Sequence, residues 1–238
     1  MVTQVQVGEI SVDVELKGIK NVHLSVYPPT GRVRISAPQH MSIESVRVFA
    51  ISKLDWIRRH QHEFRSQERE APREYVDRES HYLWGRRLLL HVCEEDRSAT
   101  VVLKPNWIIL TVSPAANVAT KEAIMAKWYR SQVKAAVPEI VAKWAPILNV
   151  RVERFFVRKM RTKWGSCNGR AHTIRLNTEL AMKPKDCLEY VVVHEMAHLV
   201  EPTHNARFTA VMDQLMPQWR SLRDRLNSLP IHHPDWKL

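Results

Sequence analysis

The sequence predicts an α+β protein, with an N-terminal antiparallel β-rich lobe that contains one helix, followed by a mainly helical lobe. Three observations predict this class. Short apolar runs separated by turn residues fill most of residues 1–117, which is typical of strands. From residue 118 onward, apolar residues recur at helical spacing over a long segment. A further predicted helix carries histidine and glutamate residues at metal-binding spacing, and a short edge strand is expected near it.

The first 40 residues predict an antiparallel meander. Three runs, ISVDVEL, NVHLSVYP and RVRISAP, are separated by Lys-Gly and Pro-Pro-Thr-Gly turns. Ser42 begins a helix whose apolar residues continue at helical spacing to Ile57. Residues 65–80 are almost entirely polar and are interpreted as an exposed connector. A second group of strands is expected around residues 83–92, 100–103 and 107–112.

The second lobe is expected to begin with a long helix. Apolar residues from Ile124 to Trp144 form one stripe, which Pro138 is expected to bend or divide. Strands near residues 152–157 and 173–177 follow. A helix from about Lys185 and a final pair of helices, separated near Pro217, complete the chain.

The most informative motif is HEMAH at residues 194–198, followed by a further histidine. Residues four apart lie on one face of a helix, so His194 and His198 can bind one metal ion. Pro202 is expected to end the helix, which lets the chain turn back and bring in His204 as a third ligand. Three protein ligands with one position left for water are typical of catalytic zinc. We therefore predict one Zn²⁺ per chain.

Glu195 is the predicted catalytic general base. It lies about 100° around the helix from His194, close enough to polarise a metal-bound water without replacing it. It can then return the proton to a leaving nitrogen. The alternative is an amphipathic helix whose histidines face solvent. The apolar run YVVV at residues 190–193 argues against this alternative, because it would carry the histidines into the interior, where imidazoles need partners.

Substrate-binding side chains are expected nearby. The strand at residues 174–177 is expected to form the lip of the cleft, where an extended peptide can pair with its free edge. The oxygen that becomes negative during attack also needs a donor. The donors that are chemically able are Arg161, Lys163, His172, Tyr190 and Arg207. The predicted substrate-binding residues are Arg161, Lys163, Asn177, Tyr190 and Arg207.

The segments RTKWGSC at residues 161–167, IRLN at 174–177 and YVVVHEMAH at 190–198 resemble the YgjP-like metallopeptidases, relatives of the SprT-like zincins. The resemblance is dense from residue 161 to residue 219 and looser before it. It implies a zinc-dependent hydrolase and a single metallopeptidase domain over residues 1–238. Within it, residues 1–117 would form the β-rich lobe and residues 118–238 the helical, zincin-like catalytic lobe.

The net charge of +11 suggests an anionic partner. Residues 151–170 alone carry seven basic residues and one acidic residue, a net charge of +6. The basic residues are Arg151, Arg154, Arg158, Lys159, Arg161, Lys163 and Arg170. This segment is either a solvated strand and loop or a surface that binds nucleic acid or another polyanion.

The sequence thus predicts a zinc-dependent metallopeptidase that acts on a peptide or protein substrate. One alternative is a metal-dependent hydrolase of nucleotides or phosphate esters, but two-metal phosphoryl sites usually need more carboxylates than this motif offers. The other is a nucleic-acid-associated binding protein with a zinc site, although a structural site has no use for Glu195.

A cytoplasmic location is the expected one. The first residues lack the basic end and apolar core of a signal peptide. Three cysteines are too few for a disulfide framework, which fits a reducing compartment. No apolar run is long enough for a membrane-spanning helix, so no membrane partner is expected.

Overall fold

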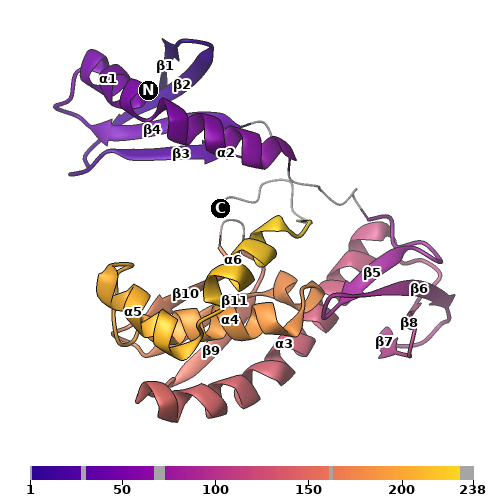
Figure 1. Ribbon diagram of the computed structural model, residues 1–238. Coiled ribbons are helices and arrows are strands. Elements are labelled where there is room, and N and C mark those ends of the chain that lie inside the picture. Colours follow the sequence, from indigo (N-terminus) through magenta and orange to yellow (C-terminus); the bar gives the residue numbers. More distant parts are fainter. Residues whose placement is uncertain (1, 28–30, 67–72, 161–162, 231–238) are drawn as a thin grey trace. The chain divides into compact units, whose positions relative to one another are not determined.

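The computed structural model describes residues 2–27, 31–66, 73–160 and 163–230, and its architecture is a mixture of helices and sheets (Figure 1). Contacts along the chain define two compact units. The first consists of Met1–Glu70 and Pro230–Leu238, and the second of Ala71–Leu229. The division therefore falls between residues 70 and 71, whereas the lobe boundary expected from the sequence lies between residues 117 and 118.

The described part of the first unit contains one sheet and two helices. Its elements are β1 (Val2–Val7), β2 (Ile10–Lys17), β3 (His23–Tyr27), β4 (Arg32–Pro38), α1 (Ile43–Ser52) and α2 (Leu54–Ser66). The strand order is β1-β2-β4-β3, and β2 pairs with β4 in parallel. The predicted antiparallel meander is therefore wrong at this pair. Strand β4 occupies the interior because Val33, Ile35 and Ala37 are all fully buried.

The helix expected from Ser42 to Ile57 is interrupted. Ser42 caps α1 as predicted, and its hydroxyl accepts a hydrogen bond from the Ser45 amide at 3.1 Å. Helix α1 ends at Ser52, with Lys53 as its C-cap, and α2 begins at the next residue. Both helices bury an apolar residue in the core of the unit, Val46 from α1 and Ile57 from α2. The single predicted helix is wrong.

The second unit begins with another mixed sheet. Its strands are β5 (Ser80–Leu83), β6 (Arg86–Glu94), β7 (Thr100–Leu103) and β8 (Trp107–Val112), in the order β5-β6-β8-β7, with β6 and β8 parallel. Positive φ angles at Trp84 and Gly85 form the tight turn between β5 and β6. Leu90 and Ile108 of this sheet share one core with Met125 of the following helix. This shared core explains why the sheet belongs to the second unit.

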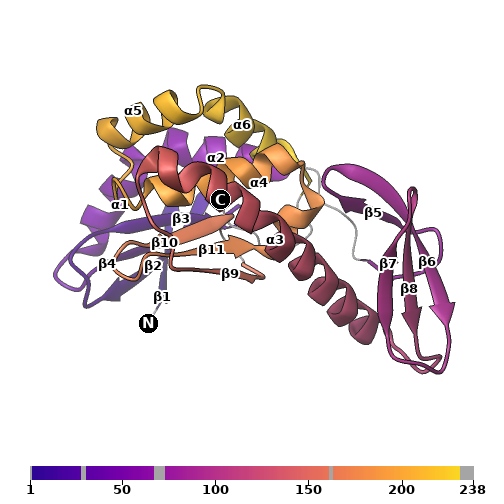
Figure 2. The ribbon, with the colours of Figure 1, turned by 90° about the horizontal axis from the view of Figure 1, so that it is seen from below.

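Helix α3 (Val118–Leu148) runs from the β5–β8 sheet towards a second, smaller sheet (Figure 2). Asn117 caps its first turn by accepting a hydrogen bond from the Thr120 amide at 2.9 Å. The helix continues through Pro138 and ends at Asn149, which adopts the left-handed conformation. Pro138 therefore does not divide the helix.

The smaller sheet consists of β9 (Arg154–Arg158), β10 (Gly165–Asn168) and β11 (Thr173–Asn177), in the order β10-β11-β9. Strand β11 is central: it pairs with β10 antiparallel and with β9 in parallel. The prediction that residues 174–177 form a free edge is therefore wrong. Strand β11 occupies the central position of the sheet because Ile174 and Leu176 are fully buried. The small and polar strand β10 lies at an edge.

Four further elements complete the unit: a 3₁₀ helix η1 (Thr178–Met182), α4 (Lys185–Ala197), α5 (Ala206–Leu215) and α6 (Trp219–Ser228). Helix α4 begins at Lys185, as predicted, and Pro217 separates α5 from α6. In Figure 2, α4 lies between the smaller sheet and helices α5 and α6, all of which it contacts. Among the described helices, none has the length and apolar character needed to cross a membrane.

Candidate metal centre

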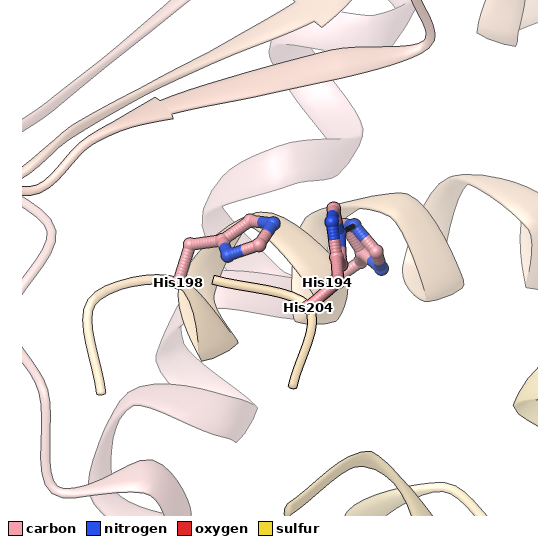
Figure 3. A group of neighbouring side chains, drawn as sticks. All are labelled: His194, His198 and His204. Atoms are coloured by element: carbon pink, nitrogen blue, oxygen red, sulfur yellow. Dashed lines mark hydrogen bonds between the residues drawn. The ribbon is translucent and has the colours of Figure 1, made fainter. Parts of the chain in front are cut away.

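Three histidines converge at the C-terminal end of α4 (Figure 3). His194 lies in the last turn of the helix, His198 is its C-cap, and His204 comes from the loop before α5. One ring nitrogen of each histidine lies within 4.8 Å of the other two. The Nε2 atoms of His194 and His204 are 3.0 Å apart. The structure thus brings together the three residues that the sequence predicts as metal ligands.

A tight turn, and not Pro202, brings His204 back towards the helix. Helix α4 ends at Ala197, and the amide of Glu201 donates to the Ala197 carbonyl at 2.9 Å. The chain therefore reverses directly after His198. The expectation that Pro202 ends the helix is wrong, because the turn closes before the proline is reached.

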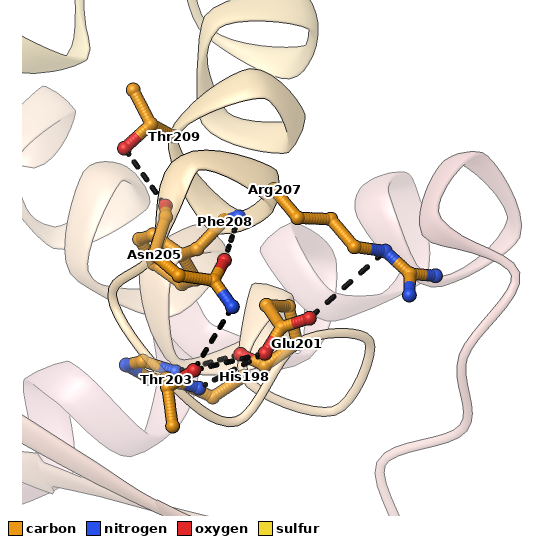
Figure 4. Close-up of polar contacts among 7 residues, drawn as sticks. All are labelled: His198, Glu201, Thr203, Asn205, Arg207, Phe208 and Thr209. Atoms are coloured by element: carbon orange, nitrogen blue, oxygen red, sulfur yellow. Dashed lines mark hydrogen bonds and ion pairs between the residues drawn. The ribbon is translucent and has the colours of Figure 1, made fainter.

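Side chains in the loop between the second and third histidine hold it in shape (Figure 4). The Glu201 carboxylate accepts hydrogen bonds from the Thr203 hydroxyl at 3.1 Å and the Thr203 amide at 3.4 Å. Asn205 donates to the Thr203 hydroxyl at 3.1 Å and caps α5 by accepting from the Phe208 amide at 3.0 Å. The bonds from Thr203 lower the pKa of Glu201, so its carboxylate stays ionised down to lower pH than usual.

The hydrogen bond of His198 fixes which of its nitrogens is free to bind a metal. Its Nδ1 lies 3.1 Å from the backbone carbonyl of Glu201. A carbonyl oxygen can only accept, so Nδ1 carries the proton and Nε2 keeps its lone pair. This type of contact orients histidine ligands in metal sites.

Phe208 supports all three imidazole rings. It is 2 % exposed, and its ring stacks on His198 with centroids 4.6 Å apart and an interplanar angle of 25°. It meets His194 and His204 edge to face, at centroid distances of 5.0 and 4.8 Å. No role is predicted for Phe208 from the sequence. The only signal is its position four residues after His204, on the first turn of α5.

Burial favours the neutral form of the His194 and His198 imidazoles. Burial, together with the nearby His198 and His204, lowers the pKa of His194 to about 3. Burial also lowers the pKa of His198. Neutral imidazole is the form that binds a metal. Four-coordinate zinc with Zn–N bonds of about 2.0–2.1 Å places its nitrogen ligands roughly 3.3–3.4 Å apart. The observed nitrogens, 3.0 Å apart at one pair and within 4.8 Å overall, fit such an ion.

Glu195 lies next to this cluster in the sequence, on the side of α4 that meets strand β10. Its side chain is 6 % exposed. Burial raises the pKa of its carboxyl to about 8, while the positive charge of Lys163 acts in the opposite direction. The protonation of such a buried carboxyl depends on the charge that is placed near it.

The predicted substrate-binding residues occupy different environments. Arg161 lies outside the described residues. Lys163 is exposed, and its charge acts on both Glu195 and His198. Tyr190 is 6 % exposed, its ring centroid lies 5.8 Å from that of His194, and burial raises its pKa to about 12. Arg207 is exposed and approaches the Glu201 carboxylate at 4.0 Å.

Asn177 is a structural residue in this arrangement. It is fully buried, and its amide donates to the Met160 carbonyl at 3.0 Å and to the Lys163 carbonyl at 3.1 Å. Its side-chain oxygen caps η1 by accepting from the Glu179 amide at 3.2 Å. These bonds tie the end of β11 to the chain on both sides of residues 161–162. Main-chain groups thus use the polar atoms of Asn177, and its expected contact with a substrate stays a prediction.

Comparisons with known proteins show what this chain is similar to. Residues 20–229 match the family model described as "YgjP-like, metallopeptidase domain". The metallopeptidase zymogen abylysin of Pyrococcus abyssi is 18 % identical, with a TM-score of 0.36, over 40 % of this chain and 99 % of that one. The metallopeptidase zymogen jannalysin of Methanocaldococcus jannaschii is 20 % identical, with a TM-score of 0.33, over 40 % of this chain and 86 % of that one. A search of curated proteins found no match.

Proposed function

The chain belongs to the YgjP-like metallopeptidase family, and from this premise we propose that it is a zinc-dependent peptidase in which Glu195 is the general base. The single observation that carries the zinc assignment is the cluster of three imidazole nitrogens within 4.8 Å of one another. The cluster has nitrogen ligands alone, which suit zinc better than magnesium or calcium.

His194, His198 and His204 would hold the ion. When bound, zinc lowers the pKa of a water molecule in its open position to about 7 and polarises the carbonyl that is attacked. His194 and His198 contribute by being neutral before the ion arrives. His198 in particular is held by its bond to the Glu201 carbonyl.

Glu195 would move the protons. It takes one from the attacking water and delivers it to the leaving nitrogen of the cleaved peptide bond. With a pKa of about 8, the carboxyl is mostly protonated at neutral pH in the metal-free protein. Glu195 directly follows His194 in the sequence, so positive charge held by the three histidines would lower the pKa of this carboxyl. Metal binding and activation of the base are therefore coupled in this proposal.

Strand β10 is the better candidate for pairing with a substrate than β11. It is an edge strand of its sheet and contacts α4, the helix that carries Glu195. An extended peptide can add to such an edge through main-chain hydrogen bonds. Lys163 comes just before β10 and is exposed, so its ammonium group is the preferred donor to the substrate oxygen that becomes negative. A peptide or protein is the proposed substrate.

The test compares zinc content and peptide cleavage in wild type and Glu195→Gln. An unbiased peptide library, read by mass spectrometry, avoids assuming a sequence preference. We expect about one zinc per chain in both proteins and cleavage reduced roughly 10²-fold or more in the variant. Glu122→Gln, an exposed change on α3, is the control for loss of a carboxylate and should cleave normally. Near-wild-type turnover by Glu195→Gln would show that Glu195 is not the general base.

A further inference from the structure

One face of strand β9 carries an aromatic ring between two arginines. Side chains alternate along the strand, so Phe155 and Val157 point into the core shared with α3 and α4. Arg154, Phe156 and Arg158 point to the opposite face and are exposed. Phe156 is 44 % exposed, which is unusual for a phenylalanine in a sheet.

A third arginine lies on the same face, on the neighbouring strand. Strands β9 and β11 pair in parallel, and Arg175 is the register partner of Phe156. Partners in register point to the same side of a sheet. Arg154 and Arg158 lie two residues before and two residues after Phe156, so their guanidinium groups flank the ring along β9. Arg175 lies beside the ring on β11.

These arginines differ from other basic residues of the same segment. Arg151 pairs with Glu153 at 2.9 Å, and Lys159 pairs with Glu122 at 3.5 Å. Within the described parts of the chain, Arg154, Arg158 and Arg175 form no ion pair with an acidic residue. Three arginines without an acidic partner among the described residues thus surround Phe156, on the face of the sheet turned away from α4. Lys163 and Arg170 also have no such partner there, but they lie outside this group.

We propose that this Arg–Phe face, defined by Arg154, Phe156, Arg158 and Arg175, binds single-stranded nucleic acid. An exposed aromatic ring gives a platform on which an unpaired base can stack, and flanking arginines contact the phosphates on either side. A base inside a duplex cannot present its ring in this way, so single strands are favoured over duplexes. The proposal is independent of the peptidase proposal, because none of the four residues belongs to the metal centre.

Charge is tested first, by fluorescence anisotropy of a labelled short oligothymidylate and oligouridylate at several salt concentrations. Wild type is compared with the double variant Arg154→Gln/Arg158→Gln. Each lost phosphate contact removes about 0.7 from the slope of log K against log salt for a single strand, so the slope should fall by about 1.4. The control, Arg86→Gln/Arg87→Gln, removes two exposed arginines from β6 and should leave the slope unchanged. Equal weakening by both double variants would mean attraction by net charge alone and would overturn the proposal.

The ring is tested separately. Phe156→Leu keeps an apolar side chain but removes stacking, so affinity should fall about fivefold or more. Phe156→Tyr keeps the ring and should bind as wild type does. Trp56→Leu, which removes another exposed aromatic residue, on α2, should have no effect. Wild-type affinity in Phe156→Leu would overturn the proposal.

Three further outcomes would also overturn it: no binding by wild type at low salt, equal affinity for a duplex of the same length, or equally effective competition by polyglutamate. The last result would identify the face as a site for acidic protein segments. Binding is expected to persist in Glu195→Gln. Failure of the peptidase proposal would therefore not contradict nucleic-acid binding, and failure of nucleic-acid binding would not contradict the peptidase proposal.

Discussion

Gly165 on strand β10 lies directly against the carboxylate of Glu195 on helix α4. A Cβ atom at position 165 would lie 2.5 Å from Oε1 of Glu195 and 2.7 Å from its Cγ, closer than non-bonded atoms can approach. The φ angle of Gly165 is not positive, so space and not backbone conformation requires glycine here. The position of Glu195 therefore depends on a missing side chain in the edge strand.

Gly165→Ala should displace Glu195 and lower turnover at least about tenfold, as part of the contribution of a general base is lost. Zinc content should not change. Gly169→Ala is the matched control, because an added Cβ there meets nothing within 4 Å. The measurements are kcat, KM and zinc stoichiometry for both variants. Normal kcat in Gly165→Ala would show that Glu195 does not need its present position.

The contact between Gly165 and Glu195 should also affect the free energy of unfolding. Overpacking typically costs about 1–3 kcal/mol, so Gly165→Ala should be less stable than Gly169→Ala by an amount in that range. Repeating Gly165→Ala in a Glu195→Ala background removes the obstructing carboxylate. Most of the loss should then be recovered in urea unfolding. If Gly165→Ala lost as much stability in the Glu195→Ala background as in wild type, the clash would not involve the Glu195 side chain.

Replacing His194, His198 or His204 by alanine should sharply reduce zinc content, because each removes one of three protein ligands. His91→Ala, a change in an exposed histidine of β6, should retain about one zinc per chain. Elemental analysis after dialysis gives the comparison. If His204→Ala kept its zinc while His194→Ala lost it, the third ligand would be another residue.

The metal-free protein should become less stable as pH rises through the range in which Glu195 ionises. The folded-state pKa of about 8 lies above the unfolded value of 4.5, so its stabilising contribution is present below pH 4.5 and lost as pH approaches and passes 8. His194, with a pKa lowered to about 3, acts in the opposite sense: its contribution is present above 6.5 and is lost as pH falls.

Comparison with metal-free Glu195→Gln isolates the glutamate, since His194 is common to both proteins. The variant should gain stability relative to wild type from pH 5 to pH 8.5, by at most about 1.4 kcal/mol per pH unit. Thermal unfolding at matched pH values measures this difference. A constant difference across the range would contradict the raised pKa.

Asn177→Asp should destabilise the fold without touching the metal ligands. The substitution keeps the acceptor oxygen but replaces the NH₂ group, which donates to the Met160 and Lys163 carbonyls, with a second oxygen. Buried groups left without partners cost about 1–3 kcal/mol each, so a loss of this order or more is expected in urea unfolding. Asn168→Asp is the control. Asn168 is exposed and its oxygen only accepts, from the Ala171 amide, so its substitution should be nearly neutral.

The sequence by itself determined features that depend on neighbouring residues. The cap at Ser42 and the start of α4 at Lys185 follow from local residue types, and the structure has them where they were predicted. The grouping of His194, His198 and His204 also follows, because helical spacing fixes two of them and a short loop returns the third.

Only the tertiary structure decided which segments lie side by side. Strands β4 and β11 lie in the interior of their sheets because non-local packing buries their apolar residues most deeply, and alternation along a strand does not reveal its neighbours. The same limit applies to single residues. Asn177 appears in sequence as a polar side chain at the end of a strand, yet bonds across the chain make it structural. Gly165 appears as a turn former, yet its role comes from a helix 30 residues away in sequence, whose glutamate fills the space that a side chain would need.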